Sequence, residues 1–83
     1  MNNQTKNYIR GIIFQLIPIE KREEVTDQIY EQTKDLRSVY NIELITKGIL
    51  LQYQKHNEQE GRISRVAKDI SQFVIDKNLN KPK

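Results

Sequence analysis

The side chains of this sequence that could do chemistry are few and widely spaced. His56 is the only histidine and cysteine is absent, so neither a thiolate metal site nor a cluster of histidine ligands can form. Three serines, at Ser38, Ser64 and Ser71, lack the strand-to-helix context that exposes a nucleophilic serine. His56 fits a surface position near a helix end better than the role of a general base. These residues argue against an enzyme.

The glycines and carboxylates lead to the same interpretation. Gly11, Gly48 and Gly61 are isolated, so no glycine-rich loop exists to cradle a phosphate group. The Asp and Glu residues stand in mixed runs with lysine and arginine, where a solvated helix face explains them. We expect no cofactor and no metal site.

The cationic residues point to binding instead. The net charge is +3 and is unevenly placed: the first seventeen residues are positive, and the last seven contain three lysines and no acid. The candidate partner-recognition residues are Arg62, Arg65, Lys68, Lys77, Lys81 and Lys83. Three of these lysines form a basic tail over residues 77–83, and each could contribute about 1 kcal/mol near an anionic membrane. A frayed, solvated chain end is the simpler explanation of that tail.

The length and composition predict what must position these cations. The chain has 83 residues, of which 36% are apolar and 30% charged. This is typical of one small helical domain whose core is built from amphipathic faces. We predict an all-α fold, an antiparallel four-helix bundle. The predicted helices cover residues 4–17, 19–40, 42–56 and 58–77.

The first two predicted helices carry narrow apolar stripes. In the first, the stripe at helical spacing comprises Tyr8, Ile9, Ile12, Ile13 and Leu16. Pro18 is expected to end this helix, because a residue before proline is pushed out of helical geometry. In the second, the expected buried stripe comprises Val25, Ile29, Leu36 and Tyr40, with Thr33 and Val39 beside it.

The third predicted helix has apolar residues on more than one side. Asn41 is its expected N-cap. Its apolar residues are Ile42, Leu44, Ile45, Ile49, Leu50 and Leu51. This pattern predicts the most buried helix of the four, packed by neighbours on two sides. Gly48 in its middle indicates a close helix crossing.

A polar break separates the third helix from the last. Asn57 and Glu60 have the spacing of a capping box, while Gly61 could instead be a left-handed residue that closes the third helix. The sequence leaves this choice open. In the last helix the expected core face comprises Ile63, Val66, Ala67, Ile70, Phe73 and Val74. Arg62, Arg65, Lys68, Asp69 and Gln72 fall mostly on the opposite, solvated face.

Binding to nucleic acid is a weaker interpretation of the same stretch. A helix, a turn with glycine and a second helix superficially resemble a helix-turn-helix. With Gly61 as the turn glycine, Asn57 stands where a small residue is usual and Arg62 where an apolar one is usual. Ala67 replaces a larger aliphatic residue. Nucleic acid is therefore not the favoured partner.

The chain has no stretch that predicts a membrane span or a signal peptide. The apolar run Ile12–Ile19 is interrupted by Gln15 and Pro18 and is far shorter than a span requires. We expect a cytoplasmic protein, part of which associates with the membrane through the basic tail.

The sequence GILLQYQKHNEQEGRISRVAKDISQFVIDKNL, residues 48–79, resembles the C-terminal half of pediocin-like (class IIa) bacteriocin immunity proteins of the enterocin A immunity type. The similar features are the Gly48-Ile49 step, the polar segment 55–59, and the basic amphipathic helix 62–75 that leads into a lysine-rich tail. The N-terminal half matches in the number and spacing of helices.

This resemblance implies an antiparallel four-helix bundle in the cytoplasm of a Gram-positive bacterium. The implied partner is the complex of a bacteriocin with the membrane permease of the mannose phosphotransferase type, recognised from inside the cell so that the lethal pore is blocked. Specificity in the family lies mainly in the part that corresponds to residues 57–83, and this chain is shorter after its last helix than many members. A small phage- or plasmid-borne protein-binding regulator is the alternative, followed by a DNA-binding protein.

Overall fold

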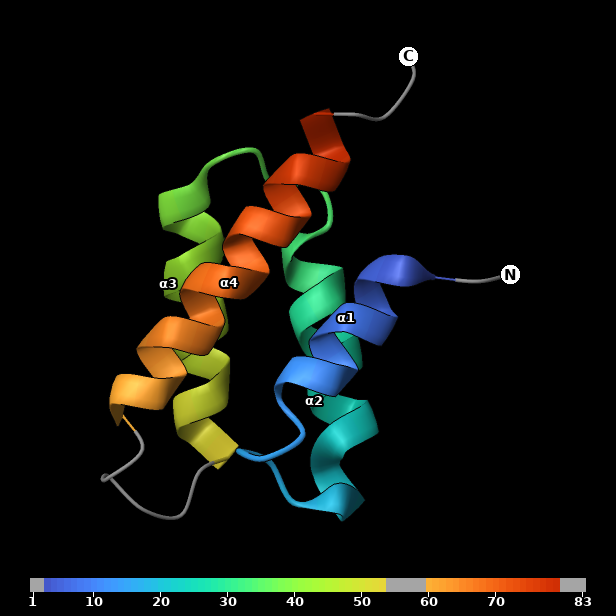
Figure 1. Ribbon diagram of the computed structural model, residues 1–83, viewed down its shortest axis with the longest axis vertical. Helices are drawn as coiled ribbons and strands as arrows, with labels where there is room; N and C mark the ends of the chain where they lie inside the picture. The colour runs from blue at the N-terminus through green and yellow to red at the C-terminus, as the bar shows by residue number, and fades with distance from the viewer. Residues whose placement is uncertain (1–2, 54–59, 80–83) are drawn as a thin grey trace.

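The computed structural model describes residues 3–53 and 60–79, which form four α-helices and no strand. The helices are α1 (Gln4–Ile12), α2 (Ile19–Thr33), α3 (Val39–Tyr53) and α4 (Glu60–Leu79). The all-α prediction is therefore confirmed. Consecutive helices run in opposite directions (Figure 1), as the bundle prediction requires.

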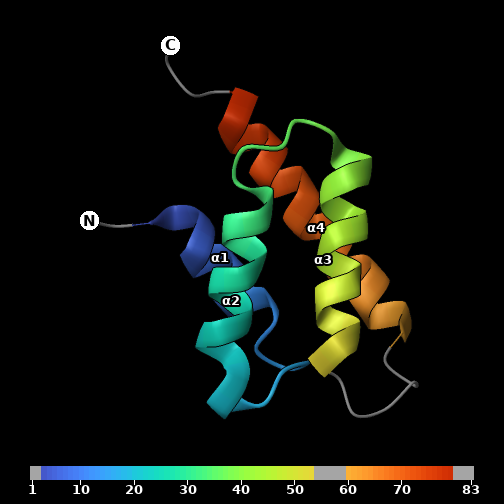
Figure 2. The same cartoon turned by 180° about the vertical axis from the view of Figure 1, so that it is seen from behind.

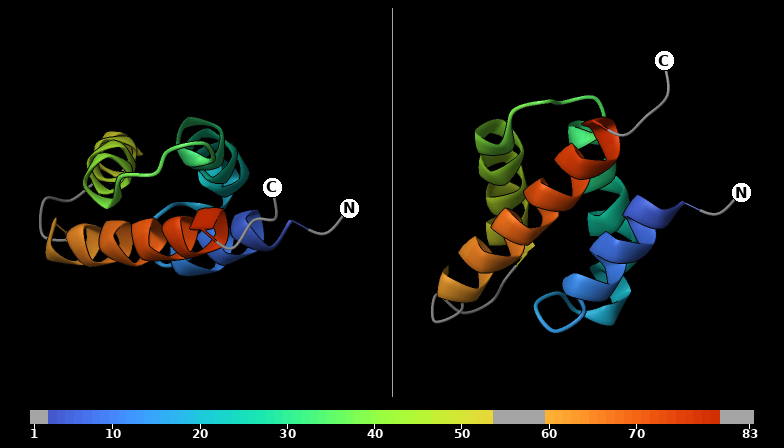
Figure 3. Two further views of the ribbon diagram at one scale, coloured as in Figure 1. Left: turned by 90° about the horizontal axis from the view of Figure 1, so that it is seen from above. Right: turned by 45° about the horizontal axis from the view of Figure 1, so that its top comes forward.

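The helices lie in two layers. Seen from above in Figure 3, α2 and α3 form one layer and α1 and α4 form the other. Each helix contacts the next around a ring, α1 with α2, α2 with α3, α3 with α4 and α4 with α1, and the α3–α4 pairing is the most extensive. This arrangement gives every described helix two neighbours and is compatible with a bundle.

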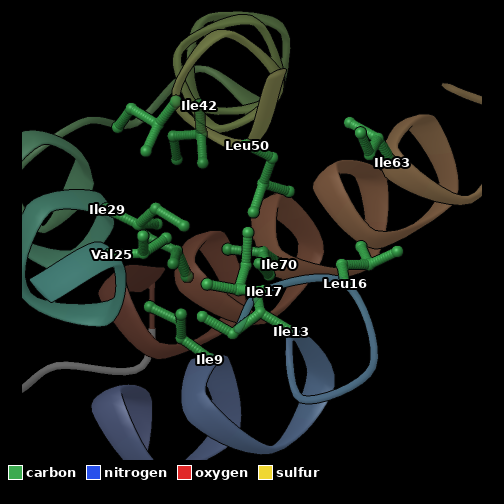
Figure 4. Packing of buried hydrophobic residues seen from close by; sticks show 12 residues of the cluster. Ile9, Ile13, Leu16, Ile17, Val25, Ile29, Ile42, Leu50, Ile63 and Ile70 are labelled. Carbon is green, nitrogen blue, oxygen red and sulfur yellow. The ribbon is translucent and has the colours of Figure 1, made fainter. Parts of the chain in front are cut away.

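A single cluster of aliphatic side chains fills the space between the layers (Figure 4). Ile9 from α1, Ile29 from α2, Ile42 from α3 and Ile70 from α4 are each fully buried. Burial of apolar area at about 25 cal/mol per Å² is the main force that holds such a bundle together. The core face predicted for the last helix is confirmed, since Ile63, Ala67, Ile70 and Val74 are all buried.

Four small polar residues are also fully buried: Thr26, Thr33, Thr46 and Ser71. The Thr33 hydroxyl donates to the carbonyl of Ile29 at 2.7 Å, and the Ser71 hydroxyl donates to that of Lys68 at 2.7 Å. Such bonds to the preceding turn allow a hydroxyl to be buried. The hydroxyls of Thr26 and Thr46 have no hydrogen-bond partner among the described residues.

The first helix ends earlier than predicted. It stops at Ile12, not at residue 17, and residues 13–17 form a turn in which Leu16 N donates to Ile13 O at 2.9 Å. Gly11 weakens the last helical turn, and the chain must reverse before Pro18. The predicted apolar stripe still reaches the core, because the turn buries Ile13 and Leu16.

The predicted C-terminal end of the second helix, at residue 40, was wrong. Residues 34–38 separate α2 from α3, so the range 19–40 contains two elements. Ser38 accepts a hydrogen bond from Asn41 N at its side chain, 3.3 Å, and from Ile42 N at its carbonyl, 3.0 Å. Ser38, not Asn41, is therefore the N-cap of α3. Tyr40 belongs to α3 and is 70% exposed instead of buried.

Two predictions for the later helices were also wrong, and one alternative that the sequence left open is excluded. A Cβ atom at Gly48 would meet nothing within 4 Å, so no described helix crosses there. Gly61 lies inside α4 and no glycine among the described residues has positive φ, which excludes it as a left-handed cap. Leu44 and Leu51 are 57% and 40% exposed, so α3 has an open side.

The capping role considered for Asn57 lies outside the described residues, as do the predicted end of the third helix at 56 and the start of the fourth at 58. The last helix, α4, continues to Leu79, past the predicted end at 77.

Candidate functional site

The outer face of α4 carries the best-defined group of exposed cations. Arg62, Arg65 and Lys68 are all exposed, as the amphipathic pattern predicted, and we call these three residues the α4 strip. They follow one another at intervals of three residues, which places successive side chains about 5–6 Å apart at Cβ. α4 lies in the front layer of Figure 1, and its core face is turned toward α3 and the interior.

The α4 strip has no acidic partner within the described part of the chain. The side chains of Arg62, Arg65 and Lys68 form no ion pair or hydrogen bond with residues 3–53 or 61–79. Asp69, four residues after Arg65, lies on the side of α4 toward α1. Burial of Tyr8, and secondly the charge of Asp69, raise the pKa of the Tyr8 phenol. The strip therefore presents its three charges to solvent.

Lys77 has a different environment from the strip. Its Nζ donates to Gln4 Oε1 at 2.8 Å and lies 5.4 Å from the centroid of the Phe73 ring. The Phe73 ring in turn stacks on Tyr8 of α1, with centroids 4.1 Å apart. Lys77 thus joins the C-terminal end of α4 to the N-terminal end of α1. The structure does not bring it together with Arg62, Arg65 and Lys68.

Lys81 and Lys83, the remaining predicted recognition residues, lie outside the described residues, and so does His56. The predicted site is therefore represented by the α4 strip and Lys77.

A shallow, open groove of about 310 Å³ lies where α1, α2 and α4 meet. It is lined by Asn3, Gln4, Thr5, Tyr30, Lys34, Val74, Lys77 and Asn78. Both of its lysines are engaged, because Lys34 Nζ donates to Glu31 Oε1 at 2.9 Å and Lys77 bonds Gln4. The hydrogen bond and the charge of Glu31 raise the pKa of Lys34. Asn78 Nδ2 donates to the carbonyl of Leu36 at 2.7 Å. These contacts hold three helices together.

Charged side chains also join α1 to α2 through ion pairs. Arg10 donates to both carboxylate oxygens of Glu23, at 2.7 and 3.1 Å, and Lys6 Nζ lies 3.1 Å from Asp27. The hydrogen bond with Glu23 is the main cause that raises the pKa of Arg10. Two acids of α2 are therefore paired with two bases of α1, and these pairs form a structural contact.

The outer face of α3 is a second unusual surface, which sequence reasoning missed. Tyr40, Leu44 and Leu51 are 70%, 57% and 40% exposed, and we call them the α3 stripe. At 100° per residue these positions fall within about 40° of one another. The signal was present in the sequence as a second apolar face, opposite the one formed by Ile42, Ile49 and Leu50, but it was interpreted as core.

No helix of the described residues is long and apolar enough to cross a membrane. Within the same part of the chain, no three His, Cys, Asp or Glu side chains gather in a way that could hold a metal ion.

Comparison of the chain with protein-family profiles, with curated proteins and with solved structures gave no match.

Proposed function

We propose that this chain is an immunity protein of the kind it resembles, which protects a bacteriocin producer by binding the bacteriocin-bound permease of the mannose phosphotransferase type and blocking its pore. The observation that carries the proposal is the α4 strip. Arg62, Arg65 and Lys68 are exposed and have no acidic partner in the described residues. They also lie in the part of the chain to which the resemblance assigns recognition.

The physical argument concerns what an unpaired charge can do. A base that is already paired, such as Arg10 with Glu23, must lose one partner before it gains another. The α4 strip has no such contact to break in the described part of the chain. A cluster of like charges accelerates and orients the approach of an acidic partner, even though each exposed pair contributes only about 0.2–1 kcal/mol.

The helical bundle supports the proposal by giving the strip a rigid base. Ile63, Ala67 and Ile70 on the opposite face of α4 are fully buried, so the backbone beneath the three cations is held by core packing. A recognition surface on a packed helix loses less conformational entropy on binding than one on a loop.

Protection of a sensitive strain tests this function. The chain is expressed in a strain sensitive to class IIa bacteriocins, and the strain is challenged with a panel of these peptides. We expect resistance to one or a few of them. Sensitivity to every peptide, with the protein present and helical in the cell extract, would refute immunity and favour the protein-binding regulator.

A charge reversal tests the role of the α4 strip in that protection. The variant Arg62→Glu/Arg65→Glu is compared with Lys21→Glu/Arg37→Glu, which makes the same change in net charge at exposed positions on and after α2. We expect the strip variant to lower the highest bacteriocin concentration that the strain survives by about tenfold or more. The control should protect like the unchanged chain. Equal protection by both variants, with helicity intact, would remove the strip from the mechanism.

A further inference from the structure

The α3 stripe is an apolar helix face that no described helix covers. α3 lies in the layer that faces the viewer in Figure 2, and its core side is occupied by Ile42, Ile49 and Leu50. Tyr40, Leu44 and Leu51 stand on the opposite side. Lys47 fills the gap in this row, four residues before Leu51, and it is half-buried. The row extends over about three helical turns.

Two opposite charges border the stripe without neutralising each other. Glu43 and Lys47 are four residues apart, with the acid on the N-terminal side, which is the favourable order for an ion pair within a helix. Neither side chain has an ion pair or a hydrogen bond with residues 3–53 or 61–79. Both charges therefore remain available at the edge of an exposed apolar face.

Gly48 stands next to the stripe and has no structural explanation within the described chain. A Cβ at this exposed position would meet nothing within 4 Å, and glycine costs a helix about 1 kcal/mol relative to alanine. A helix that approached α3 from outside would be able to come closer at this position than at any residue with a side chain.

We infer that two copies of this chain associate through their α3 stripes, with the two α3 helices antiparallel. A pairing that places Tyr40 opposite the partner's Leu51 also places Leu44 opposite the partner's Lys47, because both pairs are centred between positions 45 and 46. In this register Lys47 inserts beside Glu43 of the other copy, as a knob enters the hole of a facing helix.

The pattern identifies a second copy as the occupant because it is complementary to itself. A two-fold axis brings the same patch against itself, so every contact occurs twice. When the two stripes run in opposite directions, the aromatic ring of Tyr40 faces the partner's Leu51. Leu44 then faces the aliphatic stem of the partner's Lys47. It also forms two Glu43–Lys47 ion pairs from charges that have no partner in the described part of one copy.

The size of the stripe predicts a weak, reversible dimer. A stable interface buries roughly 800 Å² on each partner, and three turns of one helix supply less than this. We expect a dissociation constant above about 1 μM, in the range of small transient interfaces. The α4 strip belongs to the other layer of the molecule and stays accessible in this dimer, so the inference is independent of the proposed function.

Sedimentation equilibrium of the full chain between about 10 μM and 1 mM tests the dimer. Glu43→Lys and Lys47→Glu each place like charges opposite one another twice, and each should raise the dissociation constant about tenfold. The exchanged variant Glu43→Lys/Lys47→Glu restores both ion pairs and should return within about threefold of the unchanged chain.

A second pair of variants distinguishes association through the α3 stripe from non-specific hydrophobic association. Leu44→Glu should leave only monomer, whereas Ile19→Glu, at the first position of α2, which is 69% exposed, should dimerise like the unchanged chain. Circular dichroism confirms that each variant is helical. Three results would each overturn the inference. The chain could stay monomeric up to about 1 mM, or the Leu44→Glu variant could still dimerise. The exchanged variant could also have a dissociation constant no lower than those of the single variants.

Discussion

The α1–α2 pair and α4 use charged side chains in opposite ways. Between α1 and α2, Arg10 and Lys6 are matched with Glu23 and Asp27, so the charges join two helices. On the outer face of α4, Arg62, Arg65 and Lys68 are exposed with no acid bonded to them in the described residues. The difference shows that in a chain rich in charge the informative cation is the one that the fold leaves unpaired.

The largest expected effect separates the two faces of α4. Ile70→Ala removes a fully buried side chain from the core and should lower the free energy of unfolding by about 2–5 kcal/mol. Arg65→Ala, five residues earlier on the exposed face, should change it by less than about 0.5 kcal/mol. Urea unfolding followed by circular dichroism measures both. A large loss of stability in Arg65→Ala would mean that the strip serves the fold.

A smaller effect on stability is expected when a paired arginine, Arg10, is replaced than when a core residue is, and an unpaired arginine, Arg65, serves for comparison. Arg10→Ala should lower the urea midpoint at low salt, because it breaks the two hydrogen bonds to Glu23. The difference from the unchanged chain should shrink in about 1 M salt, where the Debye length is only about 3 Å. Arg65→Ala is the control and should show no salt-dependent difference. If both arginines behave alike, the contrast between α1–α2 and α4 is wrong.

The smallest effect is at alkaline pH, at the junction of α1 with α4. Burial, and then Asp69, raise the pKa of Tyr8 above its ordinary value of 10.0 in the folded state. The unfolded chain therefore loses this proton first, and the contribution of Tyr8 to stability is present below about pH 10 and is lost as pH rises through the raised pKa. Tyr8→Phe should flatten the fall of the urea midpoint between pH 9 and pH 11 by a small amount. An unchanged slope would show that Tyr8 ionises alike in both states.

The long periodic element was the most predictable part of the fold. The six core positions predicted for the last helix lie on one side of α4, with Ile63, Ala67, Ile70 and Val74 buried and Val66 and Phe73 partly so. Twenty residues of one period outweigh local exceptions. The exposure of Arg62, Arg65 and Lys68 followed from the same period.

The boundary between α2 and α3 could not be found in this way. Leu36, Val39 and Tyr40 continue the apolar spacing of α2 across the break, so periodicity alone joins the two helices. The bond from Asn41 N to the Ser38 side chain decides the start of α3, and serine is a common N-cap. Asparagine and serine are about equally common at N-caps, so only the three-dimensional path of the chain separates Asn41 from Ser38.

The surroundings of α3 and Lys77 were also beyond the sequence, for a different reason. α3 is apolar on two faces, and a one-dimensional pattern does not tell which face another helix will cover. The bond between Lys77 and Gln4 joins residues 73 positions apart. No local rule reports such a contact, since it depends on how all four helices close into a ring.

That closure has a consequence for the order of events during synthesis. α1 leaves the ribosome first and α4 last, yet Tyr8 stacks on Phe73 and Gln4 accepts a hydrogen bond from Lys77. α1 can therefore complete its packing only after translation has passed residue 77. Until then Ile9 and Ile13 lack the α4 part of the core, and the contacts that α1 can already form are those with α2, including its two ion pairs.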